Sequence, residues 1–202
     1  MPRVFVVSVL LLVLAGCAGS RRAPEEEGYT FDRAAESKLV YEAVLQHMWL
    51  GDRVENVVLD PMTSGSSVEA YNLRQEFRGL RADTMRDYLA KADQTQRLPT
   101  DLNVGRPIHW YTHAEFEKNL QAAQARNEGL PLETAWEMVR TRWPNWSGWL
   151  SLGEVGFSAD GTQALVDTGA GFAGLSASWH VVLLVKRNGT WQVVREFESA
   201  RA

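Results

Sequence analysis

Apolar side chains recur at helical spacing in the first three quarters of the chain. After Asp32, a favourable helix N-cap residue, Val40, Val44 and Met48 repeat every four positions. This spacing places the three side chains on one face, and it predicts an amphipathic helix that packs against a core.

Two more helices are predicted further along. Residues 112–115 read Thr-His-Ala-Glu, a capping box in which the first and last side chains bind each other's backbone amides. A later stripe of Leu132, Trp136 and Val139 predicts a helix that ends before Pro144.

The last quarter changes to a period of two. Four runs, 152–158, 163–168, 178–187 and 190–198, predict strands, with Asp-Gly and Asn-Gly turn pairs at 160–161 and 188–189. The second turn sets a register that we expect to hold along the whole hairpin. It pairs Arg187 with Thr190, Lys186 with Trp191, Leu184 with Val193 and His180 with Phe197.

Helices that come first and strands that come last are typical of one fold class. We therefore expect an α+β fold, with helices packed on a mainly antiparallel sheet that ends in a four-stranded C-terminal meander. Apolar residues make up 45% of the 202 positions, which is ordinary for a globular core.

The N-terminal residues follow neither pattern. Arg3 precedes an apolar stretch from Val4 to Val13, and about 11 apolar residues are fewer than the ~20 that span a membrane. This arrangement is typical of an export signal. Residues 14–17, Leu-Ala-Gly-Cys, follow it and contain Cys17, the one cysteine of the chain.

The run that ends at Cys17 resembles the lipobox of bacterial lipoproteins, in which a peptidase cuts before a cysteine that carries diacylglycerol. The resemblance implies a signal peptide at 1–16, a lipidated Cys17 with a flexible tether at 17–28, and a single α+β domain at 29–202. It also implies a cell-envelope location with the membrane as a partner through acyl chains. The residue after Cys17 is Ala18 rather than Asp, which points to the outer membrane in a Gram-negative cell.

The segment 148–194 carries a second resemblance. Its Leu-Gly-Glu-Val-Gly-Phe run at 152–157 and its Asn-Gly-Thr-Trp run at 188–191 are similar to the C-terminal part of uncharacterised exported bacterial proteins. The resemblance to these proteins implies no particular activity for this chain. The formal net charge of −4 argues against nucleic acid as a partner, since nucleic-acid binding needs a basic face.

Motifs for cofactors and nucleophiles are incomplete. Residues 169–174 match G-x-G-x-x-G, and residues 174–178 nearly match G-x-S-x-G, but a strand rather than the required helix is predicted to follow each. We interpret 169–174 as a flexible hairpin loop. His109 and His113 lie on either side of a helix start, so we expect no metal site and no cofactor.

Tryptophan supplies the strongest candidate for ligand binding. Trp143, Trp146 and Trp149 recur every three residues and form a candidate ligand platform, on which sugar rings or a protein partner would stack. We favour the other interpretation, in which Trp136 and Trp143 fill the core and the segment is a buried irregular connection.

Four carboxylates on or beside the predicted meander allow a different function: Glu154, Asp167, Glu196 and Glu198. Two carboxylates about 5–9 Å apart can cleave a glycoside, but the sequence does not fix their separation. The favoured hypothesis is a non-enzymatic binding or assembly module, with cell-wall glycan or another envelope protein as its partner. The alternative is a cell-wall glycan hydrolase that uses paired carboxylates.

Overall fold

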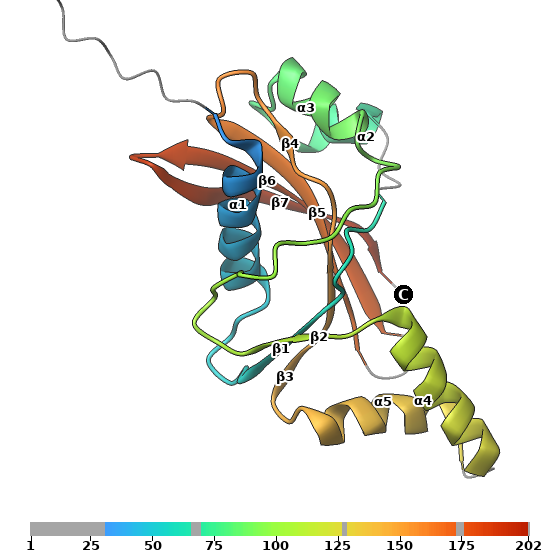
Figure 1. The fold of residues 1–202 in the computed structure, drawn as a ribbon. Coiled ribbons are helices and arrows are strands. Elements are labelled where there is room, and N and C mark those ends of the chain that lie inside the picture. Colours follow the sequence, from blue (N-terminus) through green and yellow to red (C-terminus); the bar gives the residue numbers. More distant parts are fainter. Residues whose placement is uncertain (1–30, 66–69, 127–128, 173–175, 202) are drawn as a thin grey trace, which may run out of the picture. The chain divides into compact units, whose positions relative to one another are not determined.

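A mixed seven-stranded sheet forms the centre of the domain (Figure 1). The computed structural model describes residues 31–65, 70–126, 129–172 and 176–201. The expected signal peptide, Cys17 and the tether lie outside the described residues. The strands run in the order β2-β1-β3-β5-β6-β7, with β4 paired to β5, and only the two pairings of β1 are parallel.

Five helices accompany the sheet in the described part of the chain. They are α1 (Arg33–Met48), α2 (Ala70–Glu76), α3 (Ala82–Leu89), α4 (His113–Arg126) and α5 (Pro131–Arg142). The strands are β1 (Asn56–Leu59), β2 (Ile108–Trp110), β3 (Trp146–Leu152), β4 (Gly156–Phe157), β5 (Gln163–Gly171), β6 (Ala177–Arg187) and β7 (Thr190–Arg201). The predicted α+β class, with a mainly antiparallel sheet, is confirmed.

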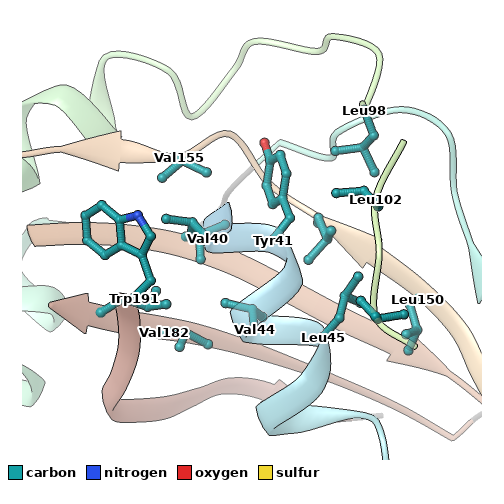
Figure 2. Close-up of a cluster of buried hydrophobic side chains, with 14 of the residues drawn as sticks. Val40, Tyr41, Val44, Leu45, Leu98, Leu102, Leu150, Val155, Val182 and Trp191 are labelled. Carbon is teal, nitrogen blue, oxygen red and sulfur yellow. The ribbon is translucent and has the colours of Figure 1, made fainter. Parts of the chain in front are cut away.

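Helix α1 covers one face of the sheet. Val40 and Val44 of its predicted stripe are buried, and Met48 is half-buried. Figure 2 shows Val40, Val44 and Leu45 packed against side chains of the sheet and of the 98–104 loop. Asp32 caps the helix as predicted, because its carboxylate accepts hydrogen bonds from the amides of Ala34 and Ala35 at 3.0 and 3.2 Å.

The opposite face carries the other four helices in two pairs. Val58 packs with the α4–α5 pair, and Leu165 and Leu183 pack with α2 and α3, whereas their strand neighbours Val57 and Leu184 face α1. Successive strand residues point to opposite faces, so each strand contributes to both cores.

The capping box at the start of α4 is confirmed. The Glu115 amide donates to Thr112 Oγ1 at 3.2 Å, and the Thr112 amide donates to Glu115 Oε2 at 2.9 Å. Helix α5 ends at Arg142, before Pro144, as its pattern predicts.

The predicted antiparallel meander is confirmed, with β4, β5, β6 and β7 paired in succession, but its first strand is shorter than predicted. The expected strand at 152–158 is divided between the end of β3 and the short β4. The physical reason is a mismatch in residue number. The three residues Gly153 to Val155 lie opposite only two residues of β5, Val166 and Asp167.

The hairpin register is right near the turn and wrong beyond it. The pairs made by Arg187, Lys186 and Leu184 are confirmed, but His180 pairs with Glu198 instead of Phe197. Leu184 faces Val193 and Leu183 faces Arg195, so one extra residue bulges out of β7 and shifts every later pair.

Gly156 lets β4 lie directly against α3. A Cβ atom at this position would lie 2.4 Å from Tyr88 Cβ and 2.5 Å from Tyr88 Cα. We expect Gly156→Ala to reduce the free energy of unfolding by about 1–3 kcal/mol, because backbone must move to admit the methyl group. Urea unfolding measures this, and Gly51→Ala is the matched control, since nothing lies within 4 Å of its added Cβ. Equal midpoints for the two variants would contradict the close approach.

Candidate functional site

The site begins at the extra residue between β3 and β4. A bulge breaks the ladder of hydrogen bonds and turns side chains away from the alternation of a regular strand. Here the bulged segment contains Glu154, whose side chain is only 8% exposed.

Neutral donors hold the Glu154 carboxylate. The Thr63 hydroxyl donates to Oε1 at 3.0 Å, and the Gln96 side-chain amide donates to Oε2. The Gln96 backbone amide in turn donates to Thr63 Oγ1 at 2.8 Å, which fixes both donors. In the described part of the chain, no cation contacts this carboxylate. Burying a charged group without an oppositely charged partner costs free energy of folding.

Glu154 faces a polar cavity of about 390 Å³. Side chains from α1, from the segment after α3 and from the bulge line this space. We call it the Glu154 cavity and define it by Arg33, Tyr41, Lys91, Gln96, Arg97 and Glu154.

Two of the three cations are held in place by a single carboxylate. Asp87 accepts from Arg33 Nη1 at 2.8 Å and from Lys91 Nζ at 3.2 Å, and it also accepts from the Phe157 amide at 2.7 Å. Burial acts to raise the pKa of Asp87, but these hydrogen bonds outweigh it and leave the pKa lowered. Burial is also the main cause of the lowered pKa of Lys91.

The third cation, Arg97, has a different environment. Its guanidinium makes no ion pair with any described residue, and its side chain is exposed. Three cations and the Glu154 carboxylate therefore line the cavity, and Asp87, which is not among its lining residues, binds two of the cations. One positive charge remains for an anionic group of a ligand.

Tyr41 contributes a hydroxyl group from within the core. The residue is 2% exposed, and Figure 2 shows its ring directed away from the α1 backbone, with the oxygen at the far end. Burial, and then the charge of Glu154, raise the pKa of this hydroxyl, so it keeps its proton. It has no hydrogen-bond partner among the described residues, although it lines the cavity.

The three tryptophans of the candidate ligand platform lie in an aromatic cluster under α4 and α5. Trp143 is 7% exposed, while Trp146 and Trp149 are half-buried. The Trp149 indole donates to the Tyr111 carbonyl at 3.0 Å. Trp136 and Trp143 do fill the core, but Trp146–Leu152 is strand β3, so the expected irregular connection is wrong.

The other candidates are dispersed. Asp167 accepts from the Tyr88 hydroxyl at 2.6 Å on the α3 side, Glu198 pairs with Arg201, and Glu196 lies 3.9 Å from His47. Only Glu154 of the four proposed carboxylates lines the polar cavity.

The predicted histidine and glycine motifs have other roles. His109 bonds to Asn56 at 2.8 Å and His113 stacks on Trp149, and the described residues contain no cluster of three side chains that would hold a metal ion. Gly169 and Gly171 belong to strand β5, so the expected hairpin loop at 169–174 is wrong for these positions, while 173–175 lie outside the described residues.

Sequence reasoning identified Glu154 but missed Tyr41, Lys91 and Arg97. The one available signal was a single carboxylate within an otherwise apolar run, Leu-Gly-Glu-Val-Gly-Phe at 152–157. Comparison with known protein families, curated proteins and solved structures gives no match for this chain. In the described part of the chain, no helix is both long and apolar enough to cross a membrane.

Proposed function

We propose that this chain is a membrane-anchored envelope lipoprotein whose domain binds an acidic saccharide of the cell wall in the Glu154 cavity without cleaving it. The lipobox at 14–17 supports the anchor. The single observation that carries the binding role is the buried Glu154 carboxylate, held by neutral donors beside three cations and a buried tyrosine hydroxyl.

The groups of the cavity match the chemistry of an acidic sugar. Guanidinium and ammonium groups bind carboxylates and phosphates through charge-assisted hydrogen bonds. Glu154 supplies acceptor oxygens for sugar hydroxyls, and Tyr41 can both donate and accept. A neutral sugar would leave the charge of Arg97 without a partner, and a plain anion would make no use of Glu154.

The geometry favours binding over hydrolysis. Glycoside cleavage needs two carboxylates on either side of the scissile bond. Among the described residues that line this cavity, Glu154 is the one carboxylate. Asp87 is not a lining residue, and its carboxylate is bonded to Arg33 and Lys91. Among the described residues, the cavity therefore holds one carboxylate and not the pair that glycoside cleavage needs.

Calorimetric titration of the purified full-length chain tests this proposal with two sugars. N-acetylmuramic acid and N-acetylglucosamine differ by one lactyl carboxylate. We expect the acidic sugar to bind at least about tenfold more tightly, the scale of one charge-assisted hydrogen bond. Arg97→Gln should remove this preference, while Arg53→Gln, at an exposed position outside the cavity, should keep it.

Glu154→Gln tests the other half of the site. The amide keeps the size of the side chain but loses acceptor capacity, so we expect both sugars to bind about tenfold more weakly. A thermal melt of the same sample checks that the variant is folded. Equal affinities of wild type and Glu154→Gln for both sugars would contradict the proposed site.

A further inference from the structure

A second cavity lies on the face of the sheet opposite α1, and indole rings dominate its walls. It has a volume of about 310 Å³, within the range of ligand sites. We call it the indole cavity and define it by Trp136, Trp149, Trp179, Asp60, Ser151 and Gly171. It shares no lining residue with the Glu154 cavity.

Two glycines of β5 lie against two of the rings, and Gly169 makes room for one of them. A Cβ atom on Gly169 would lie 2.7 Å from Trp179 Cδ1, and one on Gly171 would lie 3.4 Å from Trp136 Cη2. Any side chain at Gly169 would displace the Trp179 indole from its place over the strand. The glycine at position 169 is therefore explained by the space that the Trp179 indole needs.

The rings enclose the cavity from different elements. Trp136 comes from α5, Trp149 from β3 and Trp179 from β6, and the centroids of Trp136 and Trp149 lie 6.3 Å apart with ring planes inclined by 60°. Inclined rings present π faces to one space instead of stacking on each other. The Trp149 indole N–H is already used by the Tyr111 carbonyl, so this ring offers its face rather than a donor.

The charged group of the cavity is a carboxylate. Asp60 lies directly after β1 and is half-buried, and it accepts a hydrogen bond from the Met62 amide at 2.9 Å. No lysine or arginine lines the cavity among the described residues. Burial raises the pKa of the Asp60 carboxyl, and this effect outweighs the Met62 hydrogen bond and the charge of His113, which both lower it.

We propose that the indole cavity binds a methylated ammonium group, of the kind that choline carries. The negative π faces of indoles attract such cations, and the Asp60 carboxylate adds a full opposite charge. An anion would be repelled by the Asp60 carboxylate. A primary ammonium needs several acceptors for its three N–H donors, whereas a trimethylammonium group needs none.

Calorimetric titration of the full-length chain with three probes tests this proposal. Choline is compared with 3,3-dimethylbutan-1-ol, which has the same shape without the charge, and with n-butylammonium, a primary amine. We expect choline to bind at least about tenfold more tightly than either, as cation–π attraction in a partly desolvated site predicts.

Variants separate π attraction from simple burial. Trp179→Leu keeps an apolar side chain but removes the π face, and we expect choline to bind about fivefold more weakly, with Trp179→Phe in between. Asp60→Asn should weaken choline binding and leave the neutral alcohol unchanged. Glu154→Gln should leave choline binding unchanged, which separates this proposal from the proposed saccharide site.

Three results of the comparisons would overturn the proposal, and a fourth is the absence of any binding. The three are equal affinities for choline and the neutral alcohol, tighter binding of butylammonium than of choline, and unchanged choline binding in Trp179→Leu. Absence of measurable binding of choline to the wild-type chain would overturn it equally.

Discussion

Glu36→Gln is expected to destabilise the domain by about 3–5 kcal/mol, the usual cost of removing one partner from a buried ion pair. Glu36 is 5% exposed, and its carboxylate accepts from Lys186 Nζ at 2.5 Å and from the Trp191 indole at 2.7 Å. These bonds join α1 to β6 and β7. Glutamine has one side-chain oxygen where glutamate has two. Its NH₂ group would face either the Lys186 ammonium or the Trp191 indole N–H, so that donor would lose the acceptor that Glu36 provides.

Thermal and urea unfolding measure this effect. For a domain of this size the melting temperature should fall by about 6–20 °C. Asp101→Asn is the control, because it removes an equally short ion pair with Lys38, 2.6 Å long, that is exposed to solvent. We expect the melting temperature of that variant to equal that of the wild type. If Glu36→Gln also melts with the wild type, the interior ion pair does not hold α1 on the sheet.

Cys17→Ser is expected to abolish membrane anchoring. Each buried CH₂ of an acyl chain contributes about 0.8 kcal/mol, so two or more chains make release negligible, while a serine oxygen carries none of them. Detergent-phase partitioning and intact-protein mass measure the change in cells that make the protein. Wild type should partition into detergent with the mass of a lipidated chain that starts at residue 17.

The variant should lack both the lipid mass and the cut before residue 17. Ala18→Ser, which keeps Cys17, is the matched control and should behave as wild type. A Cys17→Ser chain that is cut at the same bond and still partitions into detergent would contradict the anchor and, with it, the envelope location.

Local signals in the sequence predicted local structure well. The Asp32 cap and the Thr112–Glu115 capping box depend on residues at most three positions apart, and the structure confirms both. The turn at Asn188 and Gly189, both with positive φ, likewise fixed the nearest pairs of its hairpin.

The predictions of pairing far from a turn were wrong wherever a strand contains one extra residue. The bulge in β7 shifts His180 by one pair, and the bulge between β3 and β4 turns Glu154 out of the ladder. A periodic pattern does not reveal such insertions, because one extra residue changes the face of every side chain beyond it.

The candidate site was only partly predictable for a related reason. Its groups come from α1, from the segment after α3 and from the bulge, which lie far apart in sequence. Tyr41 reads as one more apolar position of a helix stripe, and Arg97 as one more charged residue in a loop. Only the assembled fold shows that both line the same cavity as Glu154.

Co-sedimentation with purified sacculi, followed by analysis of the released products, tests the central claim most directly. The full-length wild-type chain should pellet with the sacculi and release no soluble glycan fragments. The Glu154→Gln and Arg97→Gln variants should stay in the supernatant, while Arg53→Gln pellets. A wild-type chain that remains in solution, or one that releases fragments, would contradict a lipoprotein that binds cell-wall saccharide without cleaving it.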